Sequence, residues 1–86
     1  MTYEELQYAF ETQEPKDLMR LPTELVMAYG NHMIQRIPAH RWQPRDWATS
    51  CGIMDQFRRT QDISAKQKMF VIAACHRTLP QGLLYL

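Results

Sequence analysis

The chain has 86 residues and a formal net charge of +1, with 45% apolar and 22% charged residues, a balance typical of a small globular domain rather than a disordered chain. Its longest apolar run, residues 69–75, falls far short of the roughly 20 residues that a membrane-spanning helix needs, and no basic-then-apolar leader opens the chain. We therefore expect a cytoplasmic protein with no membrane partner.

The composition predicts an all-α fold, because glycine is scarce and Met, Ala, Leu, Gln and Glu are plentiful. A first helix is expected over residues 3–13, where Thr2 and Glu5 have the spacing of a capping box and a proline follows the last turn. A second helix is expected over residues 22–36, after a short turn at residues 17–21.

An irregular connector over residues 38–43 leads to a third predicted helix over residues 44–59, in which we expect Gly52 to allow close approach of a neighbouring helix. A fourth helix is expected over residues 64–79, with Ser64 as its N-cap. Because this last helix is apolar on all sides in its middle, we expect it to be the central and most buried element.

The prediction as a whole is one compact four-helix domain covering residues 1–86. Its third and fourth helices should form a hairpin, and the acidic first helix should pack across that hairpin. An apolar C-terminal tail, residues 83–86, follows the last helix. Such a tail either folds back over the small core, which we expect, or docks on a partner.

The sequence carries no catalytic or metal-binding signature. A nucleophile needs a base within hydrogen-bond reach, and Cys75 and His76 are neighbours on one helix, so their side chains point about 100° apart. The two cysteines, Cys51 and Cys75, are separated by 24 positions, which matches no zinc-ligand spacing, and we expect both to be reduced core thiols. We predict a non-enzymatic protein with no metal and no cofactor.

Charge is sorted along the chain. Residues 1–31 carry six acidic and two basic side chains, a balance of −4, whereas residues 32–86 carry eight basic and three acidic side chains, a balance of +5. Such asymmetry is a hint of an anionic partner for the basic half, although it can equally be matched inside one fold or between two copies of the chain.

The basic half and the tail supply the predicted partner-binding residues. Arginine and lysine at the surface suit an acidic protein or the phosphates of nucleic acid, and an exposed tryptophan beside them can stack on a base. The candidate residues are Arg41, Trp42, Arg45, Arg58, Arg59, Lys66, Lys68, Leu84, Tyr85 and Leu86.

Two short stretches resemble known proteins. Residues 81–85, a glutamine followed by apolar residues and an aromatic, resemble the peptide with which bacterial proteins bind the replication sliding clamp, with departures at Gly82, where the family usually has Leu, and at Tyr85, where it has Phe. Residues 47–67, with a tryptophan, an apolar helix and Ser-x-Lys-Gln, resemble hairpins of small bacterial and phage accessory proteins.

From these observations we expect a small accessory or inhibitor protein of bacterial or phage type, which binds a protein component of DNA metabolism or host defence. The alternative is a DNA- or RNA-binding protein that uses the basic C-terminal half. A third possibility is a homodimer in which the acidic first helix of one copy meets the basic hairpin of the other.

Overall fold

The computed structural model describes residues 1–86 and contains helices but no strands, which confirms the all-α prediction. There are five α-helices rather than four, because a short helix, α2, forms where the sequence predicts only a turn. The elements are α1 (Tyr3–Thr12), α2 (Pro15–Leu18), α3 (Thr23–Arg36), η1 (Ala39–Arg41), α4 (Pro44–Thr60), α5 (Ala65–Gly82) and η2 (Leu83–Tyr85), where η marks a 3-10 helix.

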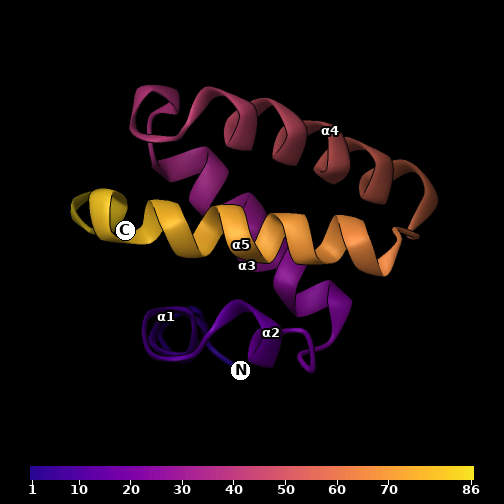
Figure 1. The fold of residues 1–86 in the computed structure, drawn as a ribbon, viewed down its shortest axis with the longest axis horizontal. Helices are drawn as coiled ribbons and strands as arrows, with labels where there is room; N and C mark the ends of the chain where they lie inside the picture. The colour runs from indigo at the N-terminus through magenta and orange to yellow at the C-terminus, as the bar shows by residue number, and fades with distance from the viewer.

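Helix α5 lies at the centre of the molecule. Figure 1 shows it between α4 on one side and α1 and α2 on the other, with α3 crossing behind it. Helix α5 also packs against all four of these helices and against η1. Val71, Ile72, Ala74 and Cys75, which occupy more than one face of α5, are each 0% exposed. A helix that is apolar on several faces is stable in water only when neighbours cover each of them.

Two capping boxes fix where α1 and α5 begin. The N–H of Glu5 donates to the Thr2 hydroxyl oxygen at 3.2 Å, and the N–H of Thr2 donates to the Glu5 carboxylate at 2.8 Å. The same reciprocal pair joins Ser64 and Gln67: the N–H of Gln67 donates to the Ser64 hydroxyl oxygen at 3.0 Å, and the N–H of Ser64 donates to the Gln67 side-chain oxygen at 2.8 Å. Each box satisfies N–H groups that have no partner within the helix, so both helix starts could be predicted from local sequence.

Helices α4 and α5 are joined by residues 61–64 and run in opposite directions, side by side (Figure 1). Gln61 ends α4 in the left-handed conformation, with φ of 58°. The side-chain amides of Gln56 and Gln67 then bond to each other across the two helices, with N–O distances of 3.4 and 2.9 Å. Gln67 therefore caps α5 and also ties it to α4.

The structure corrects two details of the predicted helices. Helix α5 continues through Pro80 to Gly82 rather than ending at residue 79, although Pro80 has no N–H to donate to the preceding turn. Gly52 is exposed, and a Cβ built on it would meet nothing within 4 Å, so the expected close approach of a helix there is wrong. Close approaches occur instead at Gly30, where an added Cβ would collide with Met54 of α4, and at Gly82, where it would collide with the Ile37 side chain. No helix is both long enough and apolar enough to cross a lipid bilayer.

We expect substitution by alanine to have opposite effects at Gly52 and at Gly82. Gly52→Ala should raise the free energy of unfolding by about 0.5–1 kcal/mol, because glycine in an exposed helix interior costs that much relative to alanine. Gly82→Ala should lower it by about 1–3 kcal/mol, because the added methyl group overpacks against Ile37. Urea unfolding followed by circular dichroism measures both. Equal effects of the two substitutions would contradict the packing described here.

Candidate partner-binding surface

Lys68 is a structural residue and not a surface cation. It is 9% exposed, and its ammonium group donates to the backbone carbonyls of Met19 and Leu21 at 2.9 and 2.6 Å. These carbonyls belong to the segment that follows α2, so Lys68 fixes that segment on the central helix. The prediction that Lys68 binds a partner is therefore wrong, because its charge is already satisfied inside the molecule.

Trp42 is also buried, which removes the predicted stacking platform. It is 4% exposed, its indole N–H donates to the carbonyl of Ile37 at 3.2 Å, and its ring meets that of Trp47 edge-on at 6.0 Å. A small core gains more from burying an indole than from leaving it in water. Trp42 thus holds η1 and α4 together, and it cannot stack on a nucleic-acid base.

Arg77 and Asp46 form an ion pair that sequence reasoning missed. The guanidinium donates from Nε to Oδ2 at 3.1 Å and from a terminal nitrogen to Oδ1 at 2.8 Å. The Asp46 side chain is 5% exposed and that of Arg77 is 45% exposed. Hydrogen bonding to Asp46 raises the pKa of Arg77 above its usual value. This two-point contact fixes the first turn of α4 to α5 and holds the guanidinium in one orientation.

The remaining basic candidates are exposed. Arg59 pairs with Asp55 one turn earlier on α4, at 3.2 Å, in a solvent-exposed contact that contributes little to stability. Arg41, Arg45, Arg58 and Lys66 are exposed and form no ion pair.

No ion pair links the acidic half of the sequence to the basic half. The three ion pairs, Lys16–Glu14, Arg59–Asp55 and Arg77–Asp46, each lie within one half of the chain. None joins an acidic residue of 1–31 to a basic residue of 32–86, although Glu24 and Arg58 line one groove between α3 and α4.

These exposed cations do not form one surface. One group lies around the α4–α5 turn and consists of Arg58, Arg59 and Lys66. We call the surface that these three residues form the turn end. Arg41 and Arg45 lie beside the start of α4, which Figure 1 places on the same side as the C-terminus. Arg45 and Arg58 are 13 residues apart on one helix, which corresponds to about 20 Å along its axis.

The tail, residues 83–86, divides into an exposed part and a packed part. Leu84 is 98% exposed and Leu83 44% exposed, whereas Tyr85 and Leu86 are half-buried against the core. The Arg41 guanidinium carbon lies 5.9 Å from the centre of the Tyr85 ring, a cation–π distance. We call the surface formed by Arg41, Arg45, Leu83 and Leu84 the tail end.

A polar cavity of about 130 Å³ opens next to the tail end. It lies between η1, the residue that precedes α4, and the last two turns of α5. Its lining combines cationic, amide and hydroxyl side chains and contains no carboxylate: His40, Arg41, Trp42, Gln43, Arg77, Thr78 and Gln81.

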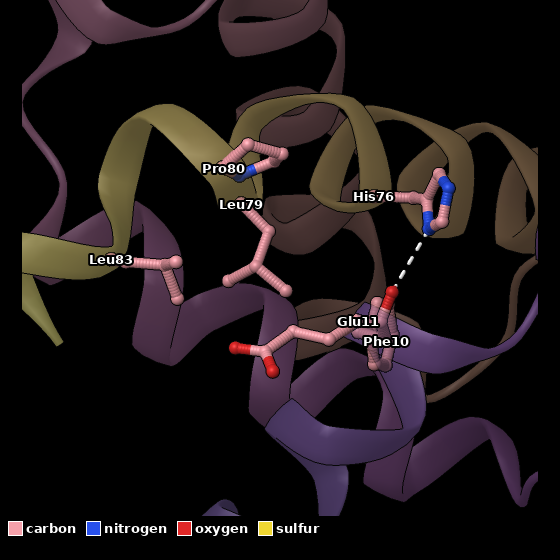
Figure 2. A pocket seen from close by; sticks show the side chains of 6 residues that line it. All are labelled: Phe10, Glu11, His76, Leu79, Pro80 and Leu83. Atoms are coloured by element: carbon pink, nitrogen blue, oxygen red, sulfur yellow. Dashed lines mark hydrogen bonds between the residues drawn. The ribbon is translucent and has the colours of Figure 1, made fainter.

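A second cavity, of about 210 Å³, lies between the end of α1 and α5 (Figure 2). His76 lines it, and its Nδ1 is 2.9 Å from the carbonyl oxygen of Phe10. Because a carbonyl only accepts, Nδ1 carries the hydrogen, and His76 acts as a C-terminal cap for α1. The other lining residues include Glu11 and the apolar Leu79, Pro80 and Leu83. This histidine contributes to the packing of α1 on α5.

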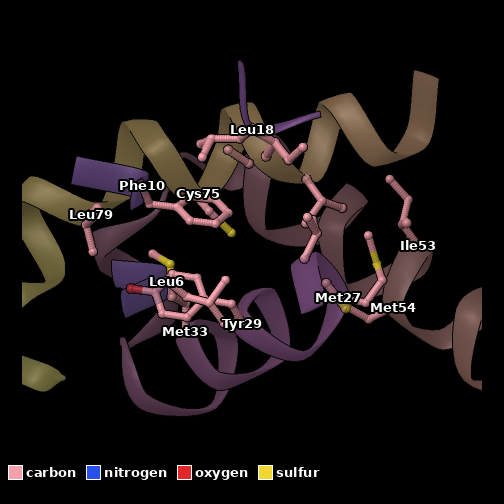
Figure 3. Packing of buried hydrophobic residues seen from close by; sticks show 14 of the residues in the cluster. Leu6, Phe10, Leu18, Met27, Tyr29, Met33, Ile53, Met54, Cys75 and Leu79 are labelled. Carbon is pink, nitrogen blue, oxygen red and sulfur yellow. The ribbon is translucent and has the colours of Figure 1, made fainter. Parts of the chain in front are cut away.

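The two thiols are poor nucleophiles at neutral pH. Figure 3 shows Cys75 among the core side chains, and its complete burial raises its pKa to about 12. Partial burial also raises the pKa of Cys51. Both cysteines are free. Since the thiolate is the reactive form, these shifts disfavour attack by either residue. The structure brings together no group of three His, Cys, Asp or Glu side chains that could hold a metal ion.

Searches with this chain found no matching protein-family model, curated protein or solved structure. The candidate surface therefore depends on the geometry and charges of this chain alone.

The two lysines on α5 provide a matched test of the structural role of Lys68. Lys68→Met should lower the free energy of unfolding by about 1–3 kcal/mol, because two partly buried carbonyls lose their donor. Lys66→Met, at an exposed position of the same helix, should change it by less than about 0.5 kcal/mol. Urea denaturation measures both values. Equal stability of the two variants would contradict the buried role of Lys68.

Proposed function

We propose that this chain is a small non-enzymatic binding protein, an accessory or inhibitor protein of bacterial or phage type that acts in the cytoplasm. Its partner in this proposal is an acidic surface on a protein of DNA metabolism or host defence. The observation that carries the proposal is the position of Leu84, which is 98% exposed at the same end as the unpaired Arg41 and Arg45.

The tail end has the two components of a protein-binding surface. Full burial of a leucine side chain is worth about 1.5–3 kcal/mol, which suits Leu84 as an anchor inserted into a partner's pocket. Arginines at the rim accelerate association with an acidic surface and select against basic ones. Tyr85 and Leu86 pack on the core, so the segment that presents Leu84 is held in place before binding, which reduces the entropy lost on association.

The second candidate function is direct binding of DNA or RNA by the turn end. It is favoured by Arg58 and Lys66, which are exposed and form no ion pair. With Trp42 buried, such binding would depend on phosphate contacts alone, and affinity would fall steeply with salt.

A capture experiment distinguishes these candidates. Immobilised protein is incubated with bacterial lysate, with and without nuclease, and bound proteins are identified by mass spectrometry. We expect a specific protein to be retained in both conditions by the unmodified chain and by Arg58→Glu, and to be lost with Leu84→Asp, because a charge at the anchor cannot enter an apolar pocket. Circular dichroism checks that both variants are folded.

Two results would contradict the proposal. Capture that disappears after nuclease treatment and with Arg58→Glu would favour nucleic-acid binding by the turn end. Capture that is equal for Leu84→Asp and the unmodified chain would show that the tail end is not the contact surface.

A further inference from the structure

We propose that the polar cavity beside the tail end binds a phosphate group, presented as a monoester on a side chain of the protein partner. The inference rests on the proposed function for the source of the phosphate, and it adds the chemical group that the partner contributes. It follows from four features of the cavity: a fixed arginine, a second positioned arginine, a threonine hydroxyl in the lining and the absence of acidic lining residues.

The fixed arginine is Arg77. Asp46 occupies two of its N–H groups, one on Nε and one on a terminal nitrogen. A guanidinium has five N–H donors, so three remain available. Because the Asp46 side chain is 5% exposed and both of its oxygens already accept from Arg77, the carboxylate holds the guanidinium in place while its own charge is compensated. A donor oriented before binding loses little entropy when an anion arrives.

The second positioned cation is Arg41, which comes from η1 on the opposite wall. Its guanidinium lies over the Tyr85 ring, and no acidic side chain pairs with it. His40 and Gln43, one on each side of Arg41 in the sequence, line the same cavity. The cavity therefore receives donors from η1, from the residue preceding α4 and from α5.

Thr78 adds a neutral hydrogen-bond donor to the lining of the cavity. It is 3% exposed and lines the cavity, and its hydroxyl is not among the fully buried unpaired groups of the molecule, which are those of Tyr29 and Ser50. A threonine in a helix can bond to a backbone carbonyl one turn earlier, as Thr12 and Thr60 do, whereas no such bond holds the Thr78 hydroxyl. The Thr78 hydroxyl is thus free to bond to a group inside the cavity.

The arrangement of donors favours a phosphomonoester over other anions. A carboxylate has two oxygens in one plane and is satisfied by a single guanidinium, as the Arg77–Asp46 pair shows. A phosphomonoester has three free oxygens that accept from several directions, whereas a phosphodiester has only two. The volume of about 130 Å³ corresponds to roughly four water molecules, which is enough for such a group.

The absence of acidic lining residues distinguishes this cavity from the other three. Glu11 lines the cavity at α1, Glu24 lines a groove between α3 and α4, and Glu4 and Glu5 line a hollow on α1. Each of these carboxylates would repel an anion. Only the cavity beside the tail end combines cations with neutral donors and has no carboxylate in its lining.

Nuclear magnetic resonance titration of the ¹⁵N-labelled full chain tests the proposal at about pH 7.5, where a phosphomonoester is mostly dianionic. The probes are inorganic phosphate, phosphoserine, dimethyl phosphate and acetate. We expect inorganic phosphate and phosphoserine to give saturable shifts of the backbone amides of His40, Gln43 and Gln81. Dimethyl phosphate and acetate should bind about tenfold more weakly, because they offer fewer oxygens to the donors.

Two variants and a control assign the binding to this cavity. Thr78→Val keeps the shape of the side chain and removes the hydroxyl, and Arg41→Gln removes an exposed charge; each should weaken phosphate binding about tenfold. Arg58→Gln, at the turn end, should leave it unchanged. The dispersion of the spectra shows whether each variant is folded. If Thr78→Val does not fold, Arg41→Gln alone decides the test.

The outcomes separate this inference from the proposed function. Shifts that do not saturate, or equal binding by Arg41→Gln, Arg58→Gln and the unmodified chain, would overturn the phosphate site, while capture that depends on Leu84 would leave the proposed function standing. Saturable phosphate binding without any Leu84-dependent capture would support the site and overturn the proposed function. Tighter binding of dimethyl phosphate than of phosphoserine would indicate a nucleic-acid ligand and would also overturn the inference.

Discussion

Burial of α5 on most of its faces is the constraint on which the rest of the structure depends. Four of its residues, Val71, Ile72, Ala74 and Cys75, are completely inaccessible to water. A chain of 86 residues has few elements with which to cover such a helix, so α1, α2, α3, α4 and η1 all pack against it. This arrangement places the two ends of α5, and the surfaces beside them, at opposite ends of the molecule (Figure 1). In this arrangement Trp42 is part of the core, whereas Leu84 of the tail lies outside it.

The same central helix divides the basic residues into two classes. Lys68 and Arg77 both lie on α5, and each directs its charge to a neighbouring element, the segment after α2 and the start of α4 respectively. Arg41, Arg45 and Arg58 lie on the outer elements and form no ion pair. Except for Arg77, the cations that stabilise the fold are therefore not the cations available to a partner. Arg77 serves both purposes, because its pair with Asp46 leaves N–H groups free.

What could be predicted from the sequence was local. The capping boxes at Thr2 and Ser64 place the starts of two helices, because the residues that form each box are three positions apart. The roles of Lys68 and Trp42 could not be predicted, because each depends on tertiary neighbours: Lys68 bonds to a carbonyl 49 positions away. For the same reason the sequence did not show that the exposed binding candidates divide between the turn end and the tail end. It also did not show that Thr78 lines a cavity with Arg41.

Native-state hydrogen exchange gives the most direct test of the claim that α5 is the element around which the molecule is organised. The account predicts that the amides of Val71, Ile72 and Cys75 exchange only through global unfolding, with a free energy equal to that from urea denaturation. Amides of residues 83–86 should exchange much faster. Exchange of the α5 amides at rates similar to those of the tail, well below the global free energy, would contradict the account.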